Sequence, residues 1–493
     1  MKKLMTSMYF AFGVIAFVCF ALSPVVQAVV PPPDGGYPNF TTAEGDNALK
    51  HLTSGLGNTG IGTFSLFSVS TGNFNTAVGA GALDLNLGSS NTATGTAALL
   101  FNTTGSENTA NGTAALEFND TGSNNTAVGA SALFTNTEGF DNTAHGAASL
   151  LENTTGHDNT GAGFSALRFN TTGFNNTGVG SGALEGNSPG LTGSNNTAAG
   201  ANALTLNTSG DNNTANGSGA LFSNVEGNNN TSGGAASMLS NTGGNDNTAN
   251  GFSALRFNTT GSGNTGFGSG ALEGNAPGIT GAFNTALGFN ALNLNTTGNG
   301  NTALGSQAGL QQDGGSGNVY IGAGVDGTVG ENDHTYIRNI NTTSVSGGGT
   351  DTVTINLTTG LLGHATSSRR YKENIAPMDK ASEALYRLNP VTYRYKKDID
   401  PTQSPAFGLI AEEVARVNPD LVTRNAKGEP ESVHYEHVNA MLLNEFLKEH
   451  QAFVEEQRKV ETLEKQVAAL TAGLQKVSMQ LDLCQPAPRN VSN

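Results

Sequence analysis

The chain has 493 residues, of which 67 are glycine and only 13% are charged, and its net charge is −16. This length predicts more than one structural unit. The acidic charge argues against a nucleic-acid-binding protein, because phosphate contacts depend on lysine and arginine. So much glycine indicates either disorder or a repeat architecture in which glycine serves the turns.

Residues 1–28 have the pattern of an export signal. Lys2 and Lys3 precede an apolar run over 8–22, and the small residue Ala28 occupies the last position before a cut. A membrane anchor helix is the alternative, but this run is short for a bilayer span. We therefore expect an exported protein, extracellular or at the cell surface, with no membrane span after signal removal.

A unit of seventeen residues, N-T-A-x-G-x-x-A-L-x-x-N-T-x-G-x-x, follows a lead segment at 29–57. It occurs in fifteen copies whose first residues run from Asn58 to Asn301. The fifth position is glycine in every copy, which suits a turn with positive φ or a close backbone approach. The ninth is nearly always leucine, as in Leu116. Helix is a poor interpretation, because Gly, Asn and Thr fill each copy.

The repeat predicts a mainly β fold, a β-solenoid or β-roll over residues 58–312 in which each coil contacts only its neighbours. Leucines would stack on leucines, and the asparagines at positions one and twelve would form ladders and occupy left-handed corners. One leucine and two or three alanines per copy bury little apolar area. We therefore expect three chains to pack their leucine stripes together. A disordered linker is the alternative, although it would not need the strict phasing.

The tandem N-[ST]-A-x-G unit resembles the head repeats of trimeric autotransporter adhesins, which are left-handed parallel β-rolls. The repeat length differs from the commonest adhesin head repeat. From this resemblance we expect a trimeric rod whose partner is a surface receptor or a glycan. Residues 313–366 contain short alternating runs such as Asp351–Leu357 and predict a β-rich neck.

A basic cluster opens the next segment. Arg369, Arg370 and Lys372 follow Ser367 and Ser368, whereas Arg168 and Arg256 are the only lysine or arginine residues between His51 and Ile337. A serine hydroxyl becomes a nucleophile when a neighbouring base takes its proton. A lysine amine can be that base if burial or nearby cations lower its pKa. This spacing alone does not distinguish a catalytic pair from a solvated basic loop, which is the alternative.

Residues 367–451 have the composition of a small α/β domain. We expect a short amphipathic helix in MDKASEALYRL, a strand in PVTYRYK, a glycine turn into a helix in FGLIAEEVARVNPDLV, and a strand leading into a long helix from SVHYEHV onward. In the first helix we expect one face to carry Ala381, Ala384, Leu385 and Leu388.

Four blocks of this segment, SSRRYKENI, LNPVTYRYK, FGLIAEEVARVNPDLV and SVHYEHVNAMLLNEFLKE, resemble the peptidase S74 family in order and spacing. These are the intramolecular chaperone domains of phage tail spikes, endosialidases and related fibre proteins. The resemblance implies a domain that trimerises, helps the upstream fibre fold in register and then cuts itself off with a Ser-Lys pair. It places the nucleophile at Ser367, the base at Lys372 and the cut between Thr366 and Ser367.

His434 and His437 lie in the last of these blocks. A zinc pair is conceivable, but no third ligand is apparent in the sequence, so we expect surface or interface histidines. We expect no metal site and no cofactor.

The segment 452–485 shows a heptad seam of about four repeats, which predicts a coiled coil without deciding between dimer and trimer. Cys19 would leave with the signal, so the mature chain carries one cysteine, Cys484, at a d position of this seam. It can join two chains or simply be buried. Residues 486–493 should be disordered. The seam positions are Val460, Leu463, Val467, Leu470, Leu474, Val477, Leu481 and Cys484.

Together these patterns predict an exported trimeric fibre or adhesin-like protein, of the tail-fibre or tail-spike kind. Its repeat rod would be aligned by a C-terminal chaperone that acts once as a self-cleaving serine endopeptidase. A surface rod with a permanent, uncut trimerisation domain is the alternative function.

Overall fold

The computed structural model describes residues 38–186, 190–275, 278–340, 353–355, 362–364, 367–425 and 427–483. The chain divides into two compact units, Met1–Thr343 and Ser344–Asn493, which are described separately below. The predicted export signal, Thr366, Cys484 and the predicted tail lie outside the described residues.

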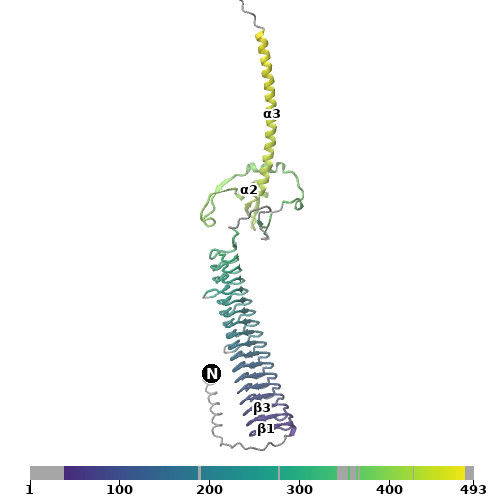
Figure 1. Cartoon of the computed structure of the whole chain (residues 1–493), viewed down its shortest axis with the longest axis vertical. Helices are drawn as coiled ribbons and strands as arrows, with labels where there is room; N and C mark the ends of the chain where they lie inside the picture. Colours follow the sequence, from purple (N-terminus) through teal and green to yellow (C-terminus); the bar gives the residue numbers. More distant parts are fainter. Residues whose placement is uncertain are drawn as a thin grey trace, which may run out of the picture. The chain divides into compact units, whose positions relative to one another are not determined.

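The first unit is a parallel β-solenoid (Figure 1). Its eighteen strands form one sheet in which each strand pairs in parallel with the strands of the coils before and after it. Every strand has three residues. The strands are β1 (Thr42–Glu44), β2 (Thr59–Ile61), β3 (Thr76–Val78), β4 (Thr92–Thr94), β5 (Thr109–Asn111), β6 (Thr126–Val128), β7 (Thr143–His145), β8 (Thr160–Ala162), β9 (Thr177–Val179), β10 (Thr197–Ala199), β11 (Thr214–Asn216), β12 (Thr231–Gly233), β13 (Thr248–Asn250), β14 (Thr265–Phe267), β15 (Thr285–Leu287), β16 (Thr302–Leu304), β17 (Val319–Ile321) and β18 (Thr335–Ile337).

This sheet extends beyond the repeat range of 58–312 at both ends, through β1 and through β17 and β18. The last two strands keep the register although their sequences, VYI and TYI, depart from the repeat. A coil can therefore be added wherever three residues can pair with the coil below. The second unit begins with an antiparallel pair, β19 (Val353–Ile355) and β20 (Leu362–His364).

A single chain of the rod encloses its hydrophobic core by itself. The middle residue of each repeat strand points inward, and the alanine and leucine columns, such as Ala110 and Leu116, are fully buried within one chain. The predicted stacking of leucine on leucine is confirmed, and a disordered linker is excluded. The expectation that several chains must share their leucine stripes is wrong, because the coil winds tightly enough to enclose its leucine by itself.

Two ladders of buried asparagine run through the coils. In the first, Asn108 Nδ2 donates to Asn91 Oδ1 at 3.2 Å, and the backbone N–H of Asn125 donates to Asn108 Oδ1 at 2.9 Å. In the second, Asn119 Nδ2 donates to Asn102 Oδ1 at 2.6 Å. The predicted ladders therefore form. The predicted left-handed corners do not fall on these asparagines.

Those corners fall instead on the seventh, ninth and seventeenth positions, and the seventeenth is an asparagine in several coils, for example Asn124 with φ of 62°. Ala114 and Leu116 have φ of 57° and 52°, and the leucine column repeats this angle from coil to coil. A left-handed leucine costs about 1–2 kcal/mol. Such a conformation persists only when surrounding contacts over-determine it, and here a buried core residue is held by identical neighbours on both sides.

The fifth-position glycine meets both conditions that the sequence suggested. Gly112 has φ of 147°, and a Cβ placed there would lie 2.4 Å from Gly129 O in the next coil. Only glycine allows the coils to stack at this spacing.

We expect Gly112→Ala to lower rod stability by at least about 1–3 kcal/mol, from backbone strain alone, before the clash with the next coil is added. Gly243→Ala is the matched control, because an added Cβ at that position would meet nothing within 4 Å. Thermal unfolding of the two variants, followed by circular dichroism, measures the difference. Equal midpoints for both variants would show that coil stacking does not depend on the fifth-position glycine.

The second unit contains a small α/β core followed by one long helix. Ala384, Val414, Leu421, Val438 and Met441 form the centre of this core. Its elements are η2 (Arg369–Tyr371), η3 (Asp379–Arg387), β21 (Val391–Tyr393), β22 (Ala406–Gly408), α2 (Ala411–Val417), η4 (Pro419–Leu421), β23 (Val422–Arg424), β24 (Pro430–Val433) and α3 (Tyr435–Leu483). β21 pairs with β22 and β23 with β24, each antiparallel.

The predicted amphipathic helix at 379–387 is a 3₁₀ helix, η3, and its inward face differs from the prediction. Ala384 is buried, Leu385 and Leu388 pack against the core, but Ala381 is exposed and Ser382 is fully buried instead. The reason is a polar partner that lies far along the chain, on α3.

That partner is Glu445, which ties α3 to η3. Its carboxylate accepts hydrogen bonds from Ser382 Oγ, from Tyr386 Oη at 2.9 Å and from Lys448 Nζ at 2.7 Å. Asn444 Nδ2 also donates to Ser382 Oγ at 2.6 Å. Hydrogen bonds from Lys448, Ser382 and Tyr386 lower the pKa of Glu445 to about 2. The ionised carboxylate therefore stabilises the contact between the two helices.

This pKa predicts an acid-sensitive contact. Because the folded pKa lies below the ordinary value of 4.5, the stabilisation is fully present above about pH 4.5 and is lost as the pH falls towards 2. Glu445→Gln should remove most of this pH dependence. Glu449→Gln, an exposed position on the same helix, should leave it intact. Unfolding midpoints between neutral pH and about pH 2 test this, and a Glu445→Gln profile as steep as wild type would contradict it.

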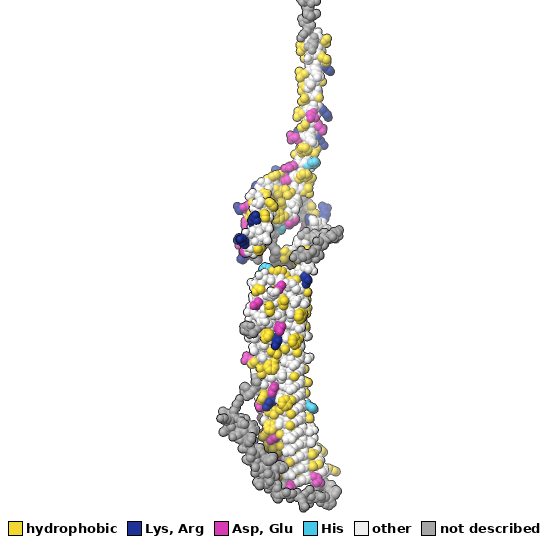
Figure 2. All heavy atoms as spheres, turned by 60° about the vertical axis from the view of Figure 1, so that its left-hand side comes forward, with side chains coloured by type: hydrophobic (Ala, Val, Ile, Leu, Met, Phe, Trp, Pro, Cys, Tyr) yellow, Lys and Arg dark blue, Asp and Glu magenta, His cyan; other side chains and the backbone are white. Residues whose placement is uncertain are grey.

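The long helix α3 spans both the predicted helix after SVHYEHV and the predicted heptad segment. Hydrophobic side chains are exposed along it (Figure 2). The seam residues from Val460 to Leu481 are about half to two-thirds exposed, for example 49% at Val460 and 67% at Leu470. None of the described helices is both long and apolar enough to span a membrane.

Candidate functional site

The basic cluster forms a single short turn at the start of the chaperone-like segment. Ser368 is the N-cap of η2, and its Oγ accepts from Arg370 N at 3.4 Å and from Arg370 Nε at 3.2 Å. Lys372 is the C-cap, and its backbone N–H bonds to Arg369 O. This turn reverses the chain so that the residue before the cap and the residue after the turn come close together.

Those two residues are Ser367 and Lys372. Lys372 Nζ lies 3.0 Å from Ser367 Oγ, within the range that a nucleophile and its general base require. Arg370 lies over the ring of Tyr371 at 5.5 Å from its centroid. The geometry thus brings the two predicted residues together, while the partner across the predicted scissile bond, Thr366, lies outside the described residues.

The surroundings of the pair limit its chemistry in a single chain. Ser367 and Lys372 are both exposed, and the amine donates a hydrogen bond to the hydroxyl. A lysine accepts a serine proton only when it is neutral, which in proteins results from burial or from nearby cations. Arg369 and Arg370 lie next to the pair in the sequence. Burial would have to come from elsewhere, for instance from another chain.

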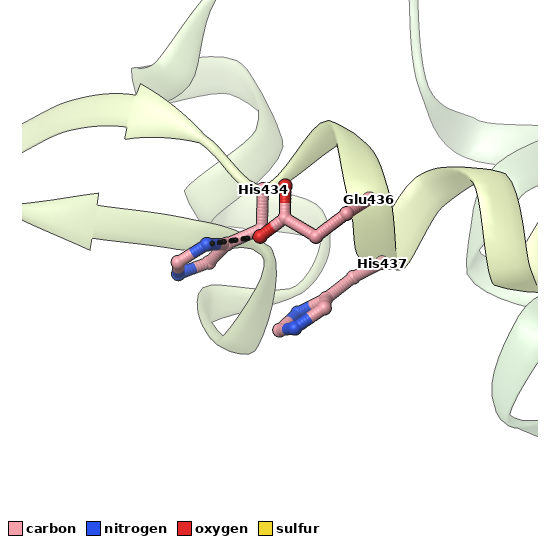
Figure 3. Close-up of side chains that lie close together, drawn as sticks. All are labelled: His434, Glu436 and His437. Atoms are coloured by element: carbon pink, nitrogen blue, oxygen red, sulfur yellow. Dashed lines mark hydrogen bonds and ion pairs between the residues drawn. The ribbon is translucent and has the colours of Figure 1, made fainter. Parts of the chain in front are cut away.

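A second cluster of chemically active side chains lies at the junction of β24 and α3. His434, Glu436 and His437 each offer a ligand atom, and these atoms all lie within 4.8 Å of one another. In Figure 3 the two imidazole rings lie near each other, and a dashed line joins the Glu436 carboxylate to His434. Glu436 is thus a third possible ligand beside the two histidines, one that was not apparent from the sequence.

Glu436 was not recognised from the sequence as a possible ligand, although it lies between the two histidines. Residue spacing near the start of a helix does not show whether a side chain turns back towards the preceding strand. His434 precedes α3, and its ring meets that of His437, one turn on, at a centroid distance of 4.7 Å. Glu436 Oε1 lies 3.1 Å from His434 Nδ1. Hydrogen bonding to its own backbone N–H and to His434 lowers the pKa of Glu436, so its carboxylate stays ionised.

Comparison with known proteins finds a family similarity within the second unit. Residues 367–423 match the model of the peptidase S74 family, which is described as the chaperone of endosialidase. The match begins at the serine of the Ser367–Lys372 pair and ends on β23. No curated protein and no solved structure matches the chain significantly.

A parallel β-solenoid followed along the chain by a segment that matches the chaperone of endosialidase fits a tail-fibre-like protein. The family match covers the turn that carries Ser367 and Lys372 but stops before the histidine cluster and α3. The first belongs to the matched domain, whereas the second is a feature of this chain's own structure.

Proposed function

We propose that the chain is an exported, trimeric fibre protein whose C-terminal domain aligns three rods and then cuts itself off between Thr366 and Ser367. The rod would act in attachment to a surface receptor or glycan outside the cell. The observation that carries the proposal is the position of the matched domain, directly after a solenoid of near-identical coils.

The coils explain why such a rod needs an aligning domain. Thr109 pairs with Thr126, and the same pairing recurs from coil to coil with almost no change in sequence. A strand that slips by one coil meets nearly the same partners, so the repeat does not by itself specify which coils of two chains lie together. Long-range β assembly is also slow. A clamp that first joins three chains at one end would set their relative register.

The exposed seam of α3 supports the association of chains. A helix of 49 residues with a heptad stripe of half-exposed valine and leucine has the apolar seam through which coiled-coil helices associate. Three copies are proposed because the S74 resemblance implies a trimer. The leucine stripe of the rod contributes nothing to this association, because it is buried within each chain.

The contact between Ser367 and Lys372 supports self-cleavage. A scissile bond adjacent to Ser367 is tethered to the nucleophile, and such intramolecular reactions have effective molarities of about 10⁵–10⁸ M. The pair is exposed in one chain. If trimerisation buries the pair, the pair becomes active only after assembly, and cleavage follows alignment rather than preceding it.

Intact mass, N-terminal sequencing and sedimentation of protein expressed in cells test this function together. The expected products are a fragment that ends at Thr366 and one that begins at Ser367, with the rod fragment sedimenting as a trimer. A monomer with residues 367–493 still attached would overturn the proposal. A trimer that stays full length would favour the alternative function, a surface rod with a permanent trimerisation domain.

One further observation favours ligand binding by the rod under either outcome. The first residue of each strand from β1 to β16 is threonine, and these threonines pair in register from Thr42 to Thr302. Each is exposed or half-buried. A single column of evenly spaced hydroxyls suits a ligand with its own regular repeat, such as a glycan polymer. The paired Thr-x-Thr array is absent here, since the third strand position varies.

A further inference from the structure

The strongest unassigned feature of the molecule is the cluster at the β24–α3 junction. Two imidazoles and one carboxylate converge there, and the ligand atoms lie within 4.8 Å of one another. His and carboxylate ligands in this ratio are a known ligand set of zinc sites that leave one coordination position open. We propose that His434, Glu436 and His437 bind a Zn²⁺ ion.

The geometry needs little adjustment for such a site. Zinc bonds of about 2.0–2.2 Å in a tetrahedron place neighbouring ligand atoms roughly 3.4 Å apart. Glu436 Oε1 and His434 Nδ1 are already 3.1 Å apart. The side chains of His437 and Glu436 are exposed, so their rotamers can shift by the remaining distance. Both residues belong to the first turn of α3.

A residue outside the ligand set holds the first histidine in place. Thr423, on β23, has its Oγ1 3.3 Å from His434 Nε2. Metal-binding histidines almost always donate their second ring N–H to an oxygen, which fixes the ring and the tautomer. When zinc displaces the proton from Nδ1, Nε2–H would donate to Thr423 and the Nδ1 lone pair would be free for the ion. The backbone N–H of His434 also donates to Leu421 O at 2.9 Å, so both ends of the residue are anchored.

The site links two structural elements. Thr423 and His434 belong to the β23–β24 hairpin and its exit, whereas Glu436 and His437 belong to α3. A bound ion would fix the direction in which α3 leaves the hairpin. Because α3 carries the heptad seam, zinc would pre-organise the helix that associates with other chains.

The test uses the protein as purified, cut or uncut at Thr366, since the three ligands all follow that bond. The protein is stripped of metal by a chelator and titrated with ZnCl₂ alone. We expect one equivalent of zinc per chain by calorimetry and a raised unfolding midpoint of the C-terminal unit. His437→Ala should abolish this binding. Thr423→Val should weaken it roughly 10-fold without removing a ligand. Co²⁺ in place of Zn²⁺ should give the intense visible absorption of a tetrahedral site.

Control variants keep the test decisive. His450→Ala removes another histidine of α3 and should leave zinc binding unchanged. Circular dichroism of each variant in the absence of metal establishes that it folds, and Glu436→Gln provides a second, milder loss of one ligand. The proposal is overturned if wild type binds no zinc, if His434→Ala and His437→Ala bind as wild type does, or if His450→Ala removes binding equally. None of these readouts depends on self-cleavage.

Discussion

Ser367→Ala is expected to leave the chain full length, with no fragment ending at Thr366. Alanine keeps the turn at 369–371 intact, because the cap of that turn is supplied by Ser368, but it removes the hydroxyl that contacts Lys372. Without a nucleophile the tethered peptide bond is as stable as any other in the chain. Denaturing electrophoresis and intact mass of protein from cells measure the outcome.

Two further variants separate chemistry from folding. Lys372→Arg keeps the charge but cannot accept a proton, so the cleavage rate should fall by about 10²–10⁴-fold. Ser368→Ala, the adjacent serine, removes the cap of η2 but not the hydroxyl near Lys372, and cleavage should persist. Unchanged cleavage in Ser367→Ala would place the nucleophile elsewhere, and full cleavage in Lys372→Arg would exclude lysine as the base.

Much of the rod could be predicted because its pattern is repeated many times. The glycine of the fifth position and the leucine of the ninth recur in phase, and both requirements, a special turn and a buried column, are local. What the pattern did not reveal is how tightly the coil winds. Left-handed φ at residues such as Leu116 makes that winding tight, and nothing in the type of residue predicts it, because leucine rarely adopts such an angle.

The second unit shows what local sequence signals could not predict. The elements were predicted in their order, since helix and strand signals are local, but the inward face of η3 was not. Ser382 is buried because Glu445, on a distant helix, supplies its partner. Polar burial of this kind depends on contacts between elements, which hydrophobic periodicity does not report.

The two candidate sites also differ in how far the sequence alone predicts them. Ser367 and Lys372 were paired through a resemblance whose spacing matches one short turn, and the structure places their side-chain atoms 3.0 Å apart. The cluster of His434, Glu436 and His437 requires knowledge of where α3 begins and of Thr423 on another strand. A sequence pattern alone therefore favoured surface histidines.

The asparagine ladder supports the second large prediction, that Asn108→Ala destabilises its coil by about 2–3 kcal/mol. Asn108 is fully buried, and its Oδ1 accepts from both the backbone N–H and the Nδ2 of Asn125. Alanine leaves that backbone N–H buried without this acceptor, whereas Gly122 O keeps the bond from Asn119 Nδ2 at 2.8 Å. The substitution should therefore weaken the contact between neighbouring coils rather than the turn within one coil.

Hydrogen exchange distinguishes the weakening of one contact between coils from a general loss of stability. Amides around residue 125 should lose protection first, because each coil of a solenoid contacts only its neighbours and opens locally. Asn111→Ala is the matched control: the residue ends strand β5 in the same coil, is exposed, and should change exchange little. Equal protection in the two variants would mean that stacked alanine and leucine, not the buried amides, hold one coil on the next. Loss confined to Asn108→Ala would instead show that the ladder specifies the stacking, since apolar columns alone tolerate small shifts that hydrogen-bonded amides do not.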